Sequence, residues 1–259
     1  MPASSFIFKC LPLLLAFALS ACEDIPRDNP LDPKNPDSYR AQSATIEAFV
    51  NTENDEQYNQ YMIMALNTIK ERYGNKVAIF HFHRNVAHFT DSLSLSENDI
   101  LYDSYINFLG SEKGVPDVFI NGPKTRIKGA SSVEAALERI EEYLQPYLLT
   151  NSYFTLEPVL SRQDGVVYAS VNIARLGSLA VENIYLRMAV TERIDNRYLS
   201  QVVRHVQISN LIPAMEPGER KAISFSRFNM RSDPNLRIQM MVISNEDLSI
   251  LQCIEEPLP

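Results

Sequence analysis

The sequence predicts an α/β domain followed by an all-β domain, with an export segment and a short tether before them. Three observations support this prediction. An apolar run that ends in cysteine opens the chain, apolar residues at helical spacing separate short apolar strands up to residue 150, and alternating apolar and polar residues dominate from there to residue 259. The expected segments are therefore 1–21, 22–42, 43–150 and 151–259.

The opening run has the form of a bacterial lipoprotein signal. Lys9 precedes an apolar stretch from Leu11 to Ala21, which is too short to span a bilayer. The stretch ends in Leu19-Ser20-Ala21-Cys22, which matches the lipobox, in which small residues precede the cysteine that receives a diacylglycerol. The motif predicts removal of residues 1–21 and a lipid anchor on Cys22. An ordinary secretory signal with a chance cysteine is the alternative.

The segment after Cys22 is rich in proline and polar residues. Prolines at 26, 30, 33 and 36 are spaced through Asp, Asn, Arg and Lys, with little apolar surface to bury, which predicts an extended tether. The Asp and Asn oxygens also suggest calcium, but the prolines and the lack of glycine disfavour a calcium loop. Glu23, directly after Cys22, favours the outer membrane over the inner membrane as the location.

Composition limits the partners and the chemistry. A formal net charge of -8 disfavours nucleic acid as a partner, and 45% hydrophobic residues are typical of a globular protein. Cys10 leaves with the signal and Cys22 carries the lipid, so Cys253 is the remaining thiol and no internal disulfide forms. Its apolar neighbours predict that Cys253 is a small core residue rather than a reactive thiol.

The expected elements of the α/β domain follow one another closely. They are a strand at 44–50, a helix at 58–73 that stops at Gly74, a buried strand at 77–83, a helix at 96–109, a strand at 117–120, a turn at Asn121-Gly122, a strand at 124–128 and a last helix. Ser131 and Glu134 are expected to cap the last helix, and Pro146 to end it.

This order of elements and one motif resemble the thioredoxin family. Gly114-Val115-Pro116-Asp117 is similar to the Gly-Val-Pro-Thr strand opening of thioredoxins, and Ile127-Lys128-Gly129 resembles the strand end that follows. The resemblance implies a thioredoxin-like fold in which Val115–Pro116 is a cis peptide facing the active site. With the lipobox and the β-rich second half, most of the chain resembles the thioredoxin-like outer-membrane lipoproteins of bacteria.

The chain departs from that family at the redox site. The positions expected to hold Cys-x-x-Cys are Asn54 and Gln57, and no cysteine lies between 23 and 252. Thiol exchange needs a thiolate, which an amide cannot supply. We therefore expect a redox-inactive protein that is not an enzyme and needs no cofactor, and that acts as a protein-binding or structural component of the cell envelope.

The resemblance also implies a binding cleft that does not depend on thiols. In thioredoxins the cis-proline loop and the helix start hold an extended peptide, so an extended segment of another envelope protein is expected between Asn54–Gln57 and Gly114–Asp117. Val115 would supply backbone groups, and Phe49 or Phe89 would supply apolar contact.

Histidines predict an alternative function for the same cleft. His81 and His83 are two apart on a strand and share one face, as in many metal sites, and His88 follows. They suggest an envelope enzyme or metal-handling protein, although no nearby Cys or Glu completes a ligand set, and packing in the core is the competing explanation. The sequence contains no Gly-x-Ser-x-Gly elbow and no phosphate-binding glycine loop.

Strand-like alternation dominates the second half. It is clearest from Ile184 to Thr191, and further strands are expected at about 153–160, 166–173, 198–208, 220–228, 236–244 and 248–254. Seven short strands in about a hundred residues predict an immunoglobulin-like sandwich. Such a module carries no chemistry by itself.

Overall fold

A computed structural model describes residues 28–32, 34–35, 37–53, 57–194 and 201–259 of the 259-residue chain. The predicted signal segment, Cys22 and Asn54 lie outside these residues. Within the described part, none of the helices has the length and apolar character needed to cross a membrane.

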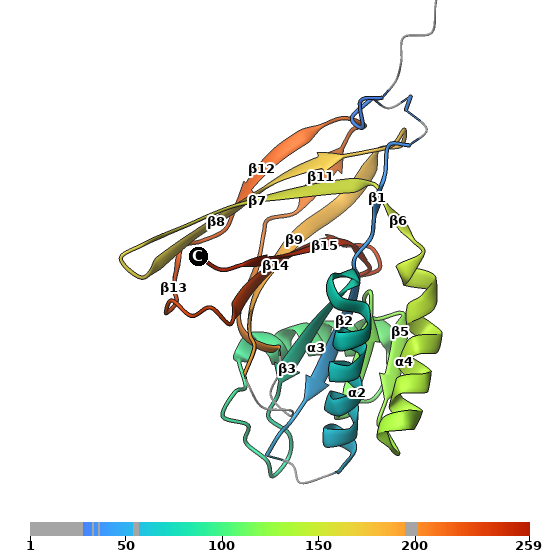
Figure 1. Cartoon of the computed structure of the whole chain (residues 1–259), viewed down its shortest axis with the longest axis vertical. Helices are drawn as coiled ribbons and strands as arrows, with labels where there is room; N and C mark the ends of the chain where they lie inside the picture. Colours follow the sequence, from blue (N-terminus) through green and yellow to red (C-terminus); the bar gives the residue numbers. More distant parts are fainter. Residues whose placement is uncertain (1–27, 33, 36, 54–56, 195–200) are drawn as a thin grey trace, which may run out of the picture.

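The α/β region is a four-stranded part of a larger sheet, with helices on both faces (Figure 1). β2 (Ala44–Val50) lies parallel to β3 (Val77–His83) on one side and antiparallel to β4 (Asp117–Ile120) on the other, and β5 (Thr125–Lys128) completes the order β3-β2-β4-β5. The helices are α2 (Gln57–Tyr73), α3 (Ser96–Leu109) and α4 (Val133–Leu148), with a short 3-10 turn, η1 (Gly74–Lys76), before β3. The element order expected from the sequence is therefore observed.

Every residue of β2 and β3 is buried, because both faces of the sheet are covered. Alternate side chains enter two cores. Ile46 and Ile79 pack with residues of α2 and α4, whereas Phe49 and Phe82 pack with residues of α3. This double coverage explains why both strands are almost continuously apolar.

The ends of α4 correct two predictions. Ser132, not Ser131, caps the helix, and its hydroxyl accepts the Ala135 N–H at 3.1 Å. Pro146 lies inside the helix, which continues to Leu148. A proline removes only the bond that its own N–H would donate, and its carbonyl still accepts the Leu149 N–H at 3.3 Å, so the last turn closes around it.

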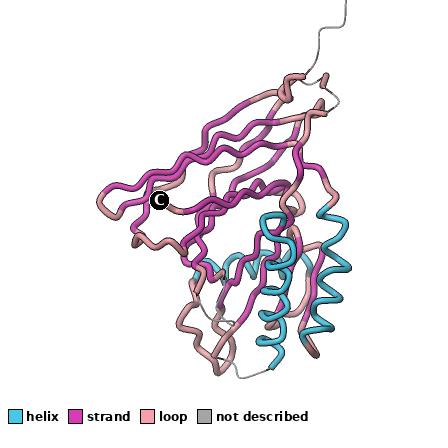
Figure 2. Tube along the Cα trace, in the orientation of Figure 1, coloured by secondary structure: helices cyan, strands magenta, loops and turns pink. Residues whose placement is uncertain are grey.

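The second half forms strands on two levels above the helices (Figure 2). β8 pairs with β7, β12 and β13 in one sheet, and the larger sheet takes β9, β10, β11, β14 and β15. The bounds are β7 (Phe154–Gln163), β8 (Val166–Arg175), β9 (Val181–Glu192), β10 (Val202–Ile208), β11 (Ile212–Met215), β12 (Arg220–Ser224), β13 (Phe228–Asn229), β14 (Leu236–Ser244) and β15 (Ile250–Pro257). An apolar core joins the two sheets.

Two details of the strand prediction were wrong. β11 was missed, because it has four residues and contains Pro213. Proline has no N–H to donate within a sheet and is therefore typical of edge strands. The strand expected at 220–228 is divided into β12 and β13. Both pair with β8, at different points along its length.

The two halves share one nine-stranded sheet, with the order β15-β14-β9-β10-β3-β2-β4-β5 and β11 beside β9. The junction is small: Val202 of β10 lies opposite His81 of β3, and the His81 N–H donates to the Gln201 carbonyl at 2.9 Å. Pairing between residues 121 apart in the sequence (202 − 81) leaves no local pattern, so the sequence did not predict it.

A buried ion pair also links the two halves of the shared sheet. Glu47 of β2 and Arg187 of β9 are both fully buried and bonded to each other, and the Tyr105 hydroxyl of α3 donates to Glu47 at 2.6 Å. Burial raises the pKa of Glu47, although Arg187 and Tyr105 act in the opposite direction. Three elements from both halves are thereby joined through charged and polar atoms.

The described residues from 28 to 38 form turns and are not extended, which differs from the prediction for this part of the tether; residues 22–27 lie outside the described residues. The Asp32 N–H donates to the Asn29 carbonyl and the Asn35 N–H to the Asp32 carbonyl, each at 2.9 Å, so the segment forms successive turns. The φ angle of proline suits turns as well as extended chain, and Asx side chains then favour the turn. The chain continues into β1 (Arg40–Ala41), which pairs with β6 (Asn151–Ser152).

Candidate functional site

The candidate site lies at the carboxyl ends of β2 and β3, next to the loop that opens β4. The Val115–Pro116 peptide in that loop is cis, which confirms the prediction. The Pro116 carbonyl accepts the Gly129 N–H at 3.0 Å, so the loop is tied to the end of β5.

A tyrosine of α3 holds the cis-proline loop through hydrogen bonds of its hydroxyl group. The Tyr102 hydroxyl accepts the Gly114 N–H at 2.7 Å and donates to Asp117 at 2.8 Å, and Arg126 forms an ion pair with the same carboxylate. Burial, together with the charge of Asp117, raises the pKa of Tyr102 to about 12. Tyr102 therefore stays protonated at neutral pH and serves as a donor in this support.

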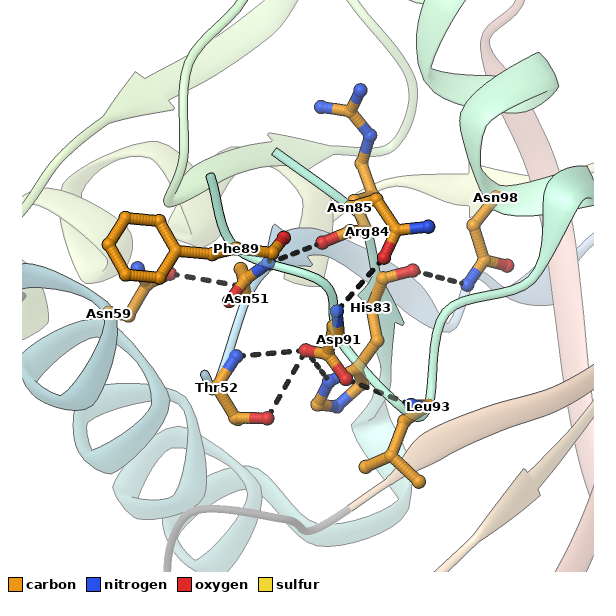
Figure 3. Close-up of polar contacts among 10 residues, drawn as sticks. All are labelled: Asn51, Thr52, Asn59, His83, Arg84, Asn85, Phe89, Asp91, Leu93 and Asn98. Carbon is orange, nitrogen blue, oxygen red and sulfur yellow. Dashed lines mark hydrogen bonds and ion pairs between the residues drawn. The ribbon is translucent and has the colours of Figure 1, made fainter. Parts of the chain in front are cut away.

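A buried histidine–carboxylate pair forms the centre of the site (Figure 3). His83 ends β3, and its Nδ1 lies 2.9 Å from Oδ2 of Asp91, with both side chains fully inaccessible. The same Oδ2 accepts the Thr52 N–H at 2.9 Å, and Oδ1 accepts the Leu93 N–H at 2.9 Å. Both carboxylate oxygens are thus engaged by donors from β3, from the end of β2 and from the loop itself.

The charge state of Asp91 follows from these donors. Burial alone would raise the pKa of Asp91, but the hydrogen bond and charge of His83, with the N–H groups of Thr52 and Leu93, lower the pKa to about 2. The carboxylate is therefore ionised at neutral pH.

Three asparagines complete the closure of the loop at 84–95. Asn51 donates to the Arg84 carbonyl at 2.7 Å and to the Phe89 carbonyl at 3.2 Å. Asn85 accepts the Asp91 N–H at 2.9 Å, and Asn98 donates to the His83 carbonyl at 2.8 Å (Figure 3). The loop is consequently held over the strand ends by side chains from the end of β2, from the loop itself and from α3.

The network of His83, Asp91, Asn51, Asn85 and Asn98 was mostly missed by the sequence reasoning, which singled out His83 alone. One local signal was present: Asp91 precedes Leu93 by two residues, the spacing at which an Asp side chain accepts a backbone N–H. The contacts of Asn51 and Asn98 span 15 residues or more and have no such signal.

The residues predicted for the cleft are only partly brought together. Gln57 is exposed at the start of α2, Val115 is half-buried and Pro116 is buried. Phe89 is 38% exposed on the loop over the site. The position of Asn54 is outside the described residues, so the placement of the whole predicted cleft stays a prediction.

Phe49 is a correction. It is fully buried, with its ring centroid 5.0 Å from Phe82 and 4.8 Å from Tyr102, and it offers no surface to a ligand. The alternation of β2 places its side chain on the α3 face, where an aromatic core encloses it.

The histidines do not line an open cleft. His81 and His83 are both fully buried, and His88 is exposed in the loop. Across the described residues, His, Cys, Asp and Glu side chains form no group of three or more that could hold a metal ion. The requirement of a closed zinc site for four ligands is therefore not met by the described residues.

Cys253 is a core residue, as predicted. It lies in β15, is 3% exposed and packs with the aromatic core beneath α3. Burial is the main cause that raises the pKa of its thiol, so the reactive thiolate is disfavoured.

Comparisons with known proteins match at the level of structure only. No family model matches the sequence, and no curated protein matches it. HBP35 of Porphyromonas gingivalis superimposes with a TM-score of 0.61 at 15% identity, over 84% of this chain and 76% of that one. A protein of Agrobacterium tumefaciens gives 0.55 at 14% identity, over 85% and 95%.

A domain of the outer membrane lipoprotein Omp28 from Porphyromonas gingivalis gives a TM-score of only 0.32 at 11% identity, over 41% of this chain and 88% of that one. Identities in this range bear on fold and not on activity. The chain therefore shares its overall fold, over most of its length, with HBP35 and the Agrobacterium protein.

Proposed function

We propose that this chain is a lipid-anchored protein of the bacterial cell envelope, in which a thioredoxin-like domain without redox activity is followed by an immunoglobulin-like β module. Its role is binding or structural. The strand order β3-β2-β4-β5 with helices on both faces supports the thioredoxin-like assignment, and the lipobox before Cys22 supports the anchor. Glu23, directly after Cys22, favours the outer membrane as the location.

The observation that carries the proposal is the chemistry at the strand ends. A redox site needs an accessible thiolate, whereas this region holds a carboxylate whose two oxygens are already bonded to Thr52, His83 and Leu93. The sequence places no cysteine near it, and Cys253 is buried in β15. A carboxylate held in this way stabilises a loop instead of exchanging bonds with a substrate.

Reduction of insulin by dithiothreitol tests the absence of thiol chemistry. We expect the mature protein to give the same rate as dithiothreitol alone, and Cys253→Ser to behave identically. Turnover above that rate that disappears in Cys253→Ser would contradict the proposal.

The anchor has its own test. Mass spectrometry of the mature N-terminus should find a diacylglycerol on Cys22 in the wild type and no acyl group in Cys22→Ala. An unmodified Cys22 in protein purified from membranes would refute the anchor.

One observation favours a second function, an envelope enzyme or metal-handling protein that uses His83. Its Nε2 is buried and has no hydrogen-bond partner among the described residues, while its Nδ1 is held by Asp91, as in the carboxylate–histidine–metal arrangement. His81 would be the nearest further ligand along the strand. Stoichiometric metal in tag-free protein, lost in His83→Ala but kept in His88→Ala, would favour this function over the first.

A further inference from the structure

We propose that the folded tether sets the orientation of the protein on the membrane, so that two loops of the β module face the lipid surface and the His83–Asp91 site points away from it. The term folded tether denotes the described residues of 28–38. This inference rests on the proposed lipid anchor at Cys22, and it adds which surface of the chain contacts lipid.

The tether contains a three-residue repeat of Asx-Pro-x. The copies are Asn29-Pro30-Leu31, Asp32-Pro33-Lys34 and Asn35-Pro36-Asp37. In each copy the Asx side chain accepts the N–H two residues further on, at 3.0, 2.9 and 2.9 Å. The Asx carbonyl also accepts the N–H three residues further on, at 2.9, 2.9 and 3.2 Å. Each turn is therefore closed by two hydrogen bonds. The backbone of this segment has less conformational freedom than that of a flexible polar linker.

The folded tether is seated on the β module. Ser38 is 2% exposed, and its hydroxyl donates to the Pro30 carbonyl and accepts the Gly177 N–H at 3.0 Å. The Leu31 carbonyl oxygen comes so close to Gly218 that a Cβ there would lie 2.9 Å from it. These contacts hold the tether against the loops at 176–180 and 216–219, which we call the tether-end loops.

The reach of the chain then limits the distance to the membrane. The segment from Cys22 to Asp28 can span no more than about 20 Å even when fully extended. Leu179, in one of the tether-end loops, is 73% exposed, and an apolar side chain beside a lipid anchor gains free energy by entering the interface. A lipid surface is therefore the partner that these loops are placed to meet.

The candidate site lies at the opposite end of the molecule (Figure 1). From Ser38 the chain runs through β1 and β2 to Thr52, and strands rise about 3.3 Å per residue, so these 14 residues (52 − 38) allow a separation of at most about 46 Å. The site would then face the aqueous side, where it meets soluble or protruding partners rather than lipid.

Energy transfer from tryptophan tests the orientation, because the chain contains no tryptophan. Leu179→Trp and Phe89→Trp each introduce one donor, at the tether-end loops and over the site. The full lipoprotein is placed in vesicles of phosphatidylethanolamine and phosphatidylglycerol that carry a dansyl-headgroup lipid. We expect transfer from Leu179→Trp to exceed that from Phe89→Trp several-fold. Equal transfer from both variants would overturn the proposal.

A second comparison tests the role of the turns. The combined variant Asn29→Ala, Asp32→Ala and Asn35→Ala removes the three side-chain acceptors, and Lys34→Ala is the matched control within the same segment. The triple variant should reduce the ratio of the two transfers toward one, and the control should leave it unchanged. A ratio that is the same in the triple variant and the wild type would show that the turns do not set the orientation.

The anchor and the orientation can fail separately. The mass of the mature N-terminus in the same samples reports whether Cys22 carries lipid. If it does not, the proposed anchor is refuted, and coupling Cys22 of the mature chain to a maleimide-headgroup lipid still measures the orientation. Cys253 is buried and does not compete for the coupling. In that arm too, equal transfer overturns the proposal and unequal transfer supports it.

Discussion

Two buried charged clusters in this molecule use different means to compensate their charges. Glu47 and Arg187 face each other inside the core, with the Tyr105 hydroxyl as a further donor. Asp91 is instead surrounded by His83 and by backbone N–H groups of two segments. The first cluster joins strands from the two halves of the chain, and the second closes the loop at 84–95 over the ends of β2 and β3. Losing the first should therefore affect the whole fold, and losing the second should affect the site.

The surroundings of the two clusters support this distinction. Nε of Arg187 is buried without a hydrogen-bond partner in the described part of the chain, and an N–H nitrogen of its guanidinium group lies 3.6 Å from the sulfur of Met241. A buried pair of this kind contributes little net stability, yet removing one member leaves the other charge uncompensated. Asp91 has local donors that can turn to solvent when the loop opens, so its loss costs less.

The largest expected effect comes from breaking the first cluster. Arg187→Ala leaves Glu47 buried without its partner, so we expect the free energy of unfolding to fall by about 3–5 kcal/mol, measured by urea denaturation. Arg220→Ala, at an exposed position on β12, is the matched control and should change it by less than about 0.5 kcal/mol. A loss below 1 kcal/mol in Arg187→Ala would show that the cluster does not join the two halves.

A smaller and pH-dependent effect is expected for Asp91→Asn. The folded-state pKa of Asp91 is about 2, below its unfolded value near 4, so its ionised form contributes stability above pH 4 that is lost as the pH falls through 2. We expect Asp91→Asn to lower the free energy of unfolding by about 2 kcal/mol at pH 7, with the difference from wild type shrinking between pH 4 and pH 2. Glu157→Gln, at an exposed position, is the control. A difference independent of pH would contradict the role assigned to the ionised carboxylate.

The smallest expected effect on the free energy of unfolding comes from the N-terminal cap of α4, which lies outside both clusters. Ser132→Ala removes the acceptor for the Ala135 N–H at the start of α4, which should cost about 1 kcal/mol. Ser131→Ala, one residue earlier and exposed, should have no measurable effect on urea unfolding. If the two variants exchanged these outcomes, the cap would be Ser131, as the spacing to Glu134 first suggested.

The sequence predicted the elements of the α/β region well because each is a local pattern. Apolar runs such as 77–83 and the helical spacing of 58–73 depend on neighbours within a few residues, and the structure has elements with nearly the same bounds. The same reasoning missed the shared sheet, since the pairing of Val202 with His81 depends on three-dimensional proximity. It also gave an extended tether, because proline content alone does not distinguish an extended chain from a series of turns closed by Asn and Asp.

The sequence predicted the cis-proline loop but not the network of His83 and Asp91 beside it, and the cleft around Asn54 stays a prediction. The Gly-Val-Pro motif located the loop before β4, and the lack of cysteine between 23 and 252 predicts that thiol chemistry is absent there. Asp91 was not singled out, because a lone Asp in a polar loop resembles any solvated residue until the loop is seen to fold over β3 (Figure 3). The mistake at Phe49 has a similar origin: the side of a doubly covered strand that a residue faces does not appear in a continuous apolar pattern.

The central claim is that Asp91 closes the site by holding the N–H groups of Thr52 and Leu93. Residue-resolved amide hydrogen exchange tests it most directly, because both N–H groups belong to segments without helix or strand partners. We predict that both amides are protected in the wild type and exchange much faster in Asp91→Asn, while amides in the centre of β2 are unchanged. Fast exchange of Thr52 and Leu93 in the wild type, at the rate of an open loop, would contradict the account.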